Sequence, residues 1–199
     1  MRTIRTDEEF SRQLAELIAA QGISSLTVGE IAAQLHCSRR RLYAIAATKE
    51  ELLLDVARRI FEEVTRQGHE AAKREKDAAK AIAAYLEVGA ATSAQASVAF
   101  LNDLQATSEG RTLFDDFQTT RTDGLKYLVD KGVECGVFAE HNSHLVAEAL
   151  LGALRQIRRP QFLAQTGLTL EQAFRELIAL ILEGLRSRPM RRSPLSKQK

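Results

Sequence analysis

Residues 26–56, LTVGEIAAQLHCSRRRLYAIAATKEELLLDV, contain three successive helix starts. Thr27 and Glu30 have the spacing of a capping box, in which the hydroxyl accepts a backbone N–H of the first turn and the carboxylate reaches back to the cap. Thr48 opens the same motif again, with a glutamate three residues later. Ser38 lies between them and can cap a further helix. These residues therefore predict two short helices followed by a long one.

The two short helices have the pattern of a helix-turn-helix, in which the first helix braces a second that lies in the major groove of DNA. Such packing needs small or apolar residues on the inner face, and the sequence supplies Ile31, Ala32, Leu35, Cys37, Leu42 and Ile45. The second helix begins with three arginines, which cannot all point inward. Arginine suits bidentate contact with guanine and also contact with phosphate. We therefore predict a DNA-binding helix-turn-helix over residues 27–46.

The distribution of charge supports a nucleic-acid partner, although the formal net charge is only +2. Residues 31–49 contain four Lys or Arg and no acid, and residues 186–199 contain six and no acid. Phosphate groups respond to a local basic patch rather than to the charge of the whole chain. The alternative is that the consecutive arginines form only a solvated helix face.

The composition favours an all-α fold. Hydrophobic residues make up 45% of the chain, and only three prolines and 11 glycines interrupt it. Leu14, Leu17 and Ile18 form an apolar stripe at helical spacing, and Gly22 is placed to end that helix. Helical periodicity continues to the last predicted helix, which Thr169 opens with a third capping box. We therefore expect helices along the chain as far as about residue 187.

The residues quoted above resemble the signature of the tetracycline-repressor (TetR/AcrR) family of transcriptional regulators. That signature combines T-V-x-x-I-A, a turn, S-x-x-x-L-Y and then S/T-K-E-x-L, and here the three elements begin at Thr27, Ser38 and Thr48. The resemblance covers roughly residues 8–60 and is specific because several spaced elements agree at once. The rest of the chain resembles the family only in its helix pattern and length.

The resemblance assigns DNA contacts to the recognition helix and to helix starts that hold flanking phosphates. The predicted contacts are Thr27, Ser38, Arg39, Arg40, Arg41, Tyr43 and Lys49. Of these, Thr27 and Lys49 match the phosphate-holding positions. A lysine at a helix start is unfavourable beside the positive end of the helix dipole, and a phosphate bound there would explain it.

Two positions depart from the family pattern. The family usually has glycine where this chain has His36, at a point where a left-handed backbone is often needed. It usually has an aromatic residue at the position of Ala46, so the recognition helix is expected to dock here with less bulk. Neither departure removes a donor to DNA.

The resemblance also implies a ligand-responsive regulator, most often a repressor, that binds a palindromic operator on double-stranded DNA as a homodimer. We expect a helix-turn-helix domain over residues 1–50, a helical effector-binding and dimerisation domain over residues 51–187, and a basic disordered tail over residues 188–199. No cofactor is implied. The alternative is a helical protein–protein interaction module without a DNA role.

A charge-poor stretch over residues 81–102 predicts an apolar effector cavity, because Glu87 is its single charge. The predicted lining is aromatic with polar handles: Tyr85, Thr92, Phe100, Asn102, Phe114, Phe117, Gln118 and Thr122. Ordinary core packing would produce the same pattern. Glu87 itself either meets a cationic ligand or reaches solvent.

The last two long helices predict a dimer interface. Residues 177–182, LIALIL, point in every direction around a helix, so some of them face away from the core of their own domain. The predicted interface residues are Val146, Ala149, Leu150, Ala153, Ile157, Leu180 and Leu182. Two such helices from each chain would form a four-helix interface with two-fold symmetry. The alternative is that both helices are buried within one chain.

The sequence gives little support for a disulfide framework, a metal site or a catalytic site. Cys37 and Cys135 form neither a disulfide framework nor a metal pattern, and we expect Cys37 to be a small buried hydrophobe rather than a redox sensor. His141 and His144 lack further ligands nearby. No catalytic motif occurs, so we do not expect an enzyme. Because no signal peptide or membrane-spanning run occurs, we expect a cytoplasmic protein without membrane contact.

Overall fold

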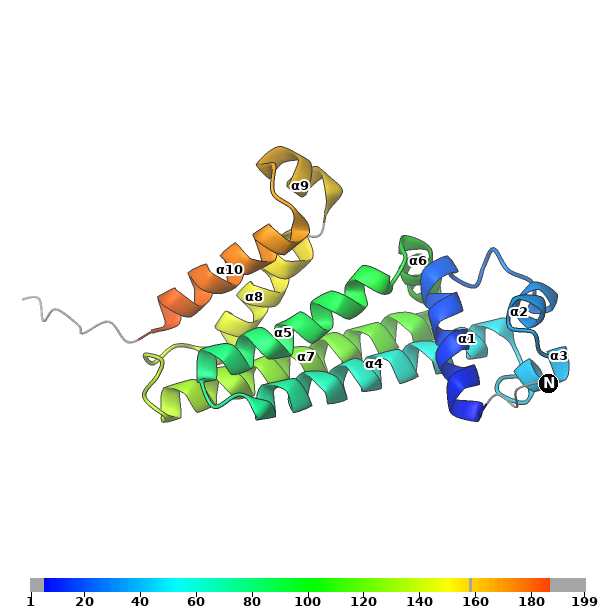
Figure 1. Cartoon of the computed structure of the whole chain (residues 1–199), viewed down its shortest axis with the longest axis horizontal. Helices are drawn as coiled ribbons and strands as arrows, with labels where there is room; N and C mark the ends of the chain where they lie inside the picture. The colour runs from blue at the N-terminus through cyan, green and yellow to red at the C-terminus, as the bar shows by residue number, and fades with distance from the viewer. Residues whose placement is uncertain (1–5, 158, 187–199) are drawn as a thin grey trace, which may run out of the picture. The chain divides into compact units, whose positions relative to one another are not determined.

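The computed structural model describes residues 6–157 and 159–186, and every regular element in these residues is an α-helix (Figure 1). The described helices are α1 (Asp7–Gln21), α2 (Val28–Gln34), α3 (Arg39–Tyr43), α4 (Lys49–Arg74), α5 (Ala78–Gln95), α6 (Val98–Ala106), α7 (Ser108–Glu134), α8 (Ser143–Ile157), α9 (Pro160–Thr166) and α10 (Leu170–Leu185). The all-α prediction is therefore confirmed. The basic tail predicted over residues 188–199 lies outside the described residues. No described helix is long and apolar enough to cross a membrane.

Threonine hydroxyls start several of these helices. Reciprocal capping boxes form at Thr27 and Thr169, as predicted, and a third forms at the start of α1. At Thr48 only half of the predicted capping box forms, because the glutamate binds the residue before the cap. The Thr48 hydroxyl accepts the N–H of Glu51 at 3.1 Å, but the Glu51 carboxylate accepts the N–H of Ala47 at 2.8 Å. Glu51 therefore ties down the residue before the cap, and α4 still begins where the sequence predicts.

The charge-poor stretch is divided between α5 and α6. Ser97 caps α6, because its hydroxyl accepts the N–H of Phe100 at 3.1 Å. The N–H of Ser97 donates to the carbonyl of Ala19 at 2.8 Å. A serine that satisfies the first free N–H groups of a new helix favours a break before it. The same residue therefore ends one helix and ties the next to α1.

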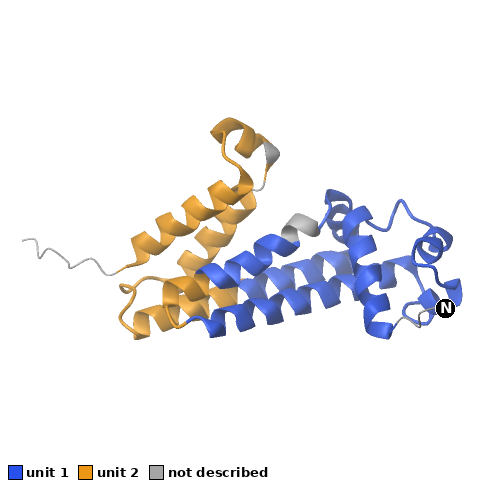
Figure 2. Ribbon diagram, viewed as in Figure 1, with its two compact units in different colours: residues 1–75, 83–121 blue, residues 76–82, 122–199 orange. Residues whose placement is uncertain are grey.

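The chain divides into two compact units, coloured separately in Figure 2. Unit 1 comprises residues 1–75 and 83–121, and unit 2 comprises residues 76–82 and 122–199. In unit 1, α1 packs on α4 and α6, and α2 packs on α3. In unit 2, α8 packs on α9 and α10. Helices α5 and α7 each contribute residues to both units.

The core of unit 1 joins the helix-turn-helix to the helices that follow it. Its most deeply buried side chains include Phe10, Leu14, Ile18, Ile31, Leu42, Val56, Phe100 and Leu104. Burial of each such side chain is worth about 1.5–3 kcal/mol. Because Phe100 and Leu104 come from α6, this helix shares a core with Leu42 of α3.

A half-buried carboxylate strengthens the junction between α6 and the end of α1. Asp103 accepts the N–H of Ile23 at 2.6 Å and the N–H of Ser24 at 3.0 Å, about 80 residues away in sequence. Burial alone would raise the pKa of Asp103, but the hydrogen bonds from Ser24 and Ile23 outweigh it, so the pKa lies below its ordinary value. The carboxylate is therefore ionised when it holds this junction together.

Unit 2 is built on the packing of α8 against α10. The buried side chains of these two helices include Ala147, Leu150, Leu151, Leu154, Ile157, Ala173, Ile178 and Leu185. Asn142 starts α8, since its side-chain oxygen accepts the N–H of Leu145 at 2.9 Å. A backbone hydrogen bond from Ala139 to the carbonyl of Leu185, at 2.9 Å, ties the end of α10 to the loop before α8.

Candidate functional site

Helices α2 and α3 form the predicted helix-turn-helix. Cys37 closes the turn between them by donating its N–H to the carbonyl of Ala32 at 2.9 Å. His36 has a left-handed backbone with φ of 49°, as expected for a position that is usually glycine. The predicted inward residues lie in the core: Ile31, Ala32, Leu35 and Leu42 are buried, and Cys37 and Ile45 pack against them while partly exposed.

Arg39 and Arg40 are exposed in the first turn of α3. Arg39 extends over α2 at Gly29, where a Cβ atom would stand 2.7 Å from its Nη2 atom. Neither arginine forms an ion pair with a residue that the structure describes. Tyr43 ends the same helix and is 54% exposed. These side chains present charge and hydrogen-bond donors on one short element.

Arg41 is placed differently from its two neighbours. Its Nη2 atom lies 2.7 Å from Oδ1 of Asp7, and its guanidinium lies 4.0 Å from the centroid of the Phe10 ring. Ser38 caps the helix by accepting the N–H of Arg41 at 3.3 Å. The side chain of Arg41 therefore joins α3 to α1.

The start of α2 is occupied by its own capping carboxylate. The Thr27 hydroxyl donates to Oε2 of Glu30 at 2.8 Å, and the Thr27 N–H donates to the same oxygen at 2.7 Å. These hydrogen bonds, with a smaller effect of the nearby charge of Lys49, hold the pKa of Glu30 below its ordinary value. An anionic carboxylate thus lies at the donors that the resemblance assigns to phosphate.

The structure does not bring the predicted effector residues together as one group. Phe100 lies in the core shared with α1, and Asn102 is exposed. Thr122 belongs to unit 2, where its hydroxyl donates to Glu148 at 3.0 Å. Thr92 is half-buried and donates to the carbonyl of Val88 in its own helix, at 3.2 Å. We therefore do not retain Phe100 and Asn102 as lining residues.

The aromatic members of that prediction form a smaller cluster in unit 1. Phe117 stacks on Phe61 with ring centroids 4.1 Å apart and an interplanar angle of 6°, and Phe114 meets Phe61 edge-on at 6.1 Å. Gln118 follows on α7 and is half-buried. Tyr85 is buried, and its hydroxyl donates to the carbonyl of Arg121 at 3.2 Å.

Arg121 is the buried charge of this cluster, and it was not among the residues predicted from the sequence. Only 6% of the residue is exposed, and its Nη2 atom has no hydrogen-bond partner among the described residues. Burial lowers the pKa of Arg121, and the charge and hydrogen bonding of Tyr85 oppose this in part. One feature of the sequence could have identified this residue. Arg121 follows Phe117 by four residues, so the two side chains lie on the same face of the helix, and that face is buried.

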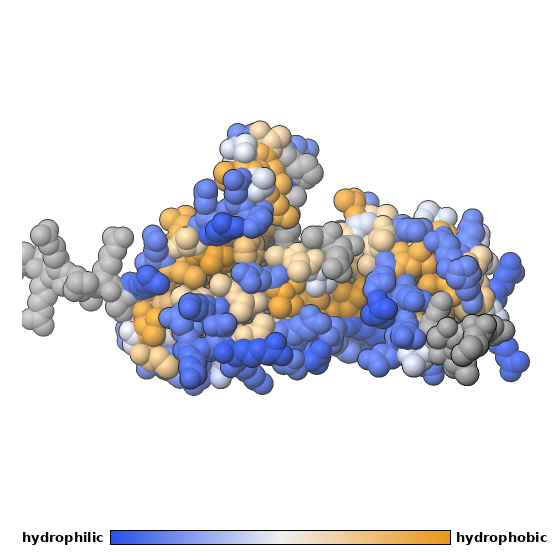
Figure 3. Space-filling model, viewed as in Figure 1, coloured by the Kyte–Doolittle hydropathy of each residue, from blue (hydrophilic) through white to orange (hydrophobic). Residues whose placement is uncertain are grey.

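The predicted interface residues divide into buried and exposed groups. Leu150 and Ile157 are 1% and 6% exposed, so they belong to the core of unit 2 and offer almost no surface to a partner. Ala149 is exposed, and Val146, Ala153 and Leu182 are half-buried. Leu180 is 69% exposed, and Leu145 on α8, which the sequence analysis missed, is 67% exposed. Figure 3 shows apolar side chains gathering over α8 and α10.

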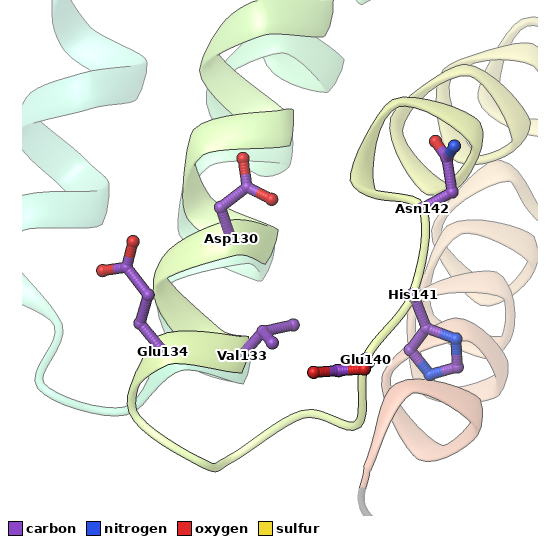
Figure 4. A pocket seen from close by; sticks show the side chains of 6 residues that line it. All are labelled: Asp130, Val133, Glu134, Glu140, His141 and Asn142. Atoms are coloured by element: carbon purple, nitrogen blue, oxygen red, sulfur yellow. The ribbon is translucent and has the colours of Figure 1, made fainter.

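Unit 2 also has an open pocket of about 580 Å³ near the end of α7, lined by Asp130, Val133, Glu134, Glu140, His141 and Asn142. Val133 and Glu140 point toward each other across it (Figure 4). A hydrogen bond from Ser143 and an ion pair with Lys126 lower the pKa of Asp130. No group of three or more His, Cys, Asp or Glu in the described residues is arranged to hold a metal ion. None of the predicted effector residues lines this pocket.

Comparison with known proteins places this geometry in a family. Residues 13–56 match the model described as bacterial regulatory proteins, tetR family. A search of curated proteins found no match. The chain is similar to the solved TetR family transcriptional regulator PfmR from Thermus thermophilus, with 22% identity, 89% of this chain and 99% of that chain covered, and a TM-score of 0.64.

Two further solved structures share the fold. One is a putative transcriptional regulator from Saccharomonospora viridis in complex with choline, with 16% identity, 90% of this chain and 96% of that chain covered, and a TM-score of 0.76. The other is the fatty acid degradation regulator FadR from Bacillus halodurans, with 17% identity, 91% and 100% covered, and a TM-score of 0.72. The family match covers the helix-turn-helix, and the fold likeness covers about nine-tenths of the chain. Residues 13–56 therefore match the tetR family of bacterial regulatory proteins, and the chain shares the fold of solved TetR-family transcriptional regulators.

Proposed function

We propose that this TetR-family regulator is a homodimeric repressor that leaves its operator when a small molecule binds. The observation that carries its DNA recognition is the exposed pair Arg39 and Arg40 at the start of α3, with no described acid paired to either. A recognition helix reads base edges with its N-terminal residues, and arginine is the most common specific partner of guanine. Such a regulator would act in the cytoplasm.

The other predicted contacts have positioning roles in this proposal. Tyr43 and Lys49 donate to phosphates on either side of the base-reading arginines, because phosphate contacts fix the register of a protein on DNA. Ser38 and Thr27 present backbone and hydroxyl groups at helix starts. Arg41 would join them where a phosphate replaces Asp7 as its partner.

Dimerisation through α8 and α10 supports paired recognition of a palindromic operator. The exposed Leu145 and Ala149 on α8, and the exposed Leu180 on α10, leave an apolar surface on this pair of helices. Two-fold symmetry would place two recognition helices one turn of DNA apart, or a multiple of it. The effector then acts by favouring a dimer in which this spacing is wrong.

The junction between α6 and α1 supports a route for that control. Asp103 and Ser97 bind the backbone at the end of α1, and Phe100 lies in the core beneath the helix-turn-helix. A shift of α6 would therefore pull on the element that braces α2 and α3. The solved Saccharomonospora viridis regulator is in complex with choline, which is consistent with a small organic effector for this fold.

The test begins with selection of bound duplexes from a random DNA library by the full chain. We expect one enriched palindromic sequence, bound by a dimer. The double variant R39A/R40A should lose this preference, whereas R59A, which removes an exposed arginine of α4, should retain it. Failure of the wild-type protein to enrich any sequence, or to bind any duplex in a salt-sensitive manner, would support the interaction-module alternative instead.

A further inference from the structure

We propose that Arg121 is the anchor for the effector, and that the effector is a small organic carboxylate. This inference rests on the proposed ligand response and names the chemistry that the ligand must carry. The site is a cation enclosed in unit 1 by Tyr85, Gly89 and Phe117.

The first argument is the unsatisfied charge. Arg121 is 94% buried, and no described carboxylate lies within ion-pair distance of it. Its Nη2 atom donates to no described acceptor. Buried charges in proteins are paired or bound to ligands, since an unpaired one costs far more than an unpaired neutral group. An arginine cannot escape this cost by losing its proton.

The second argument is the space made for the guanidinium. It lies directly on α5 at Gly89, so closely that a Cβ atom there would collide with Cζ, Nη1 and Nη2. The Tyr85 hydroxyl, one turn earlier on α5, donates to the carbonyl of Arg121 and also hydrogen-bonds its guanidinium, but it supplies no carboxylate to pair with the cation. Helix α5 therefore lacks a side chain at Gly89, where a side chain would displace the cation.

The third argument is that the side chains around the Arg121 guanidinium favour an organic carboxylate over other ligands. The Phe117 ring lies 5.8 Å from the guanidinium carbon and stacks on Phe61 in α4. An aromatic wall favours an organic body, and the planar guanidinium pairs with a carboxylate through two parallel hydrogen bonds. A cationic effector is disfavoured because Arg121 would repel it, and Glu87, the acid of the charge-poor stretch, is exposed.

The same contacts connect the site to the DNA-binding core. Phe61 belongs to the cluster that contains Phe10, Leu42 and Phe100. A carboxylate that draws the guanidinium away from Phe117 would change the packing of Phe117 on Phe61. The ligand signal therefore has a path of direct side-chain contacts within unit 1, from α7 through α4 to α1 and α6.

The experiment uses the full chain with a panel of straight-chain carboxylates from butanoate to dodecanoate and of aromatic carboxylates, each matched by its neutral amide. At saturation we expect at least one carboxylate to raise Tm by about 5 °C or more, while its amide and choline do not. R121M and G89A should lose this shift. R111M, which removes an exposed arginine from the same helix, should keep it.

A second measurement does not depend on finding the ligand. If Arg121 is an unpaired cation awaiting an anion, R121M without ligand should have a Tm equal to or above that of the wild type, because an apolar side chain removes the buried charge. A lower Tm for R121M, or no shift from any carboxylate in the wild type, would overturn the proposal. If either result is found but the wild-type protein still binds its operator, the carboxylate proposal fails and the proposed DNA-binding function stands. If the wild-type protein binds no operator, the proposed function itself is refuted.

Discussion

At the scale of single residues, three consecutive arginines take different environments. Arg39 and Arg40 are exposed, whereas Arg41 is shared between an ion pair with Asp7 and the face of Phe10. An exposed ion pair is worth about 0–1 kcal/mol, and a cation–π contact at such a site about 0.5–1 kcal/mol. Because a phosphate can replace Asp7, Arg41 has a structural role in the free protein and, in the proposed complex, a second role on DNA.

The first prediction separates these roles. R39A should weaken binding to the selected operator by about 1–3 kcal/mol and relax the base preference, with little effect on folding. R41A should lower the free energy of unfolding by about 0.5–1.5 kcal/mol, since it loses both contacts. Fluorescence anisotropy on operator and mutated-operator duplexes, with urea unfolding of each variant, measures the two effects. Unchanged operator affinity in both variants would contradict the assignment of α3 as the recognition helix.

The second prediction concerns the charges at the starts of α2 and α4. K49A should weaken binding to every duplex and make the slope of log affinity against log salt shallower by about 0.9, the share of one phosphate. E30Q keeps a capping side chain but removes a negative charge beside the Thr27 donors. It should therefore strengthen binding to all sequences. Because the pKa of Glu30 is already lowered, this gain should not vary with pH near neutrality. A weaker E30Q complex would show that the carboxylate does not compete with phosphate.

At the scale of secondary-structure elements, the junction of α6 with α1 is a connection within unit 1 that depends on directional polar contacts. It combines two backbone N–H groups bound to one carboxylate with the Ser97 bond to the Ala19 carbonyl. Both lie at helix ends, where N–H and carbonyl groups lack partners within the helix. The two helices are therefore held in register by polar contacts as well as by the apolar core.

The third prediction tests that junction. D103A should lower the free energy of unfolding by about 1–3 kcal/mol, because the N–H groups of Ile23 and Ser24 lose their acceptor. D103N keeps an oxygen acceptor and should lose less. Since the folded-state pKa of Asp103 is depressed, its stabilisation is present above the unfolded-state pKa and is lost as the pH falls through the folded value. Wild-type stability should thus fall more steeply than that of D103N in acid, as measured by urea unfolding from neutral to strongly acidic pH. Parallel curves would refute the role of the charge.

At the scale of the whole molecule, the two units divide the proposed tasks. Unit 1 contains the helix-turn-helix and Arg121, and unit 2 contains the exposed leucines of α8 and α10. Paired recognition helices require a two-fold dimer, so the exposed apolar surface of unit 2 is as necessary to the proposed function as the arginines of unit 1.

The fourth prediction is that the protein is a homodimer at micromolar concentration. L180E should shift it toward monomer, since it places a charge in the proposed apolar interface, and operator binding should be lost with the dimer. V98E is the matched control, because Val98 is 74% exposed but lies on α6 in unit 1. Sedimentation velocity over a range of concentrations measures both. A wild-type protein that remains monomeric at high concentration would exclude the interface and the paired-helix mechanism.

The sequence by itself determined where the helices of this protein begin and where the chain turns between them. Capping threonines at Thr27 and Thr169, the serine at Ser38 and the left-handed position at His36 act within three or four residues of themselves, so their spacing predicts where helices begin and turn. The helix-turn-helix and its inward-facing residues follow from the same short-range pattern.

Only the tertiary structure decided the partners of the long and charged side chains. Arg41 meets Asp7 from 34 residues away, Asp103 meets Ile23 from 80 residues away, and Arg121 lies on Gly89 of another helix. It also placed Leu150 in the core rather than at the interface. Helical periodicity predicts that one face of a helix is buried, but it does not predict which helix covers that face. The covering helix depends on contacts between elements that are distant in sequence, and the spacing of neighbouring residues carries no information about those contacts.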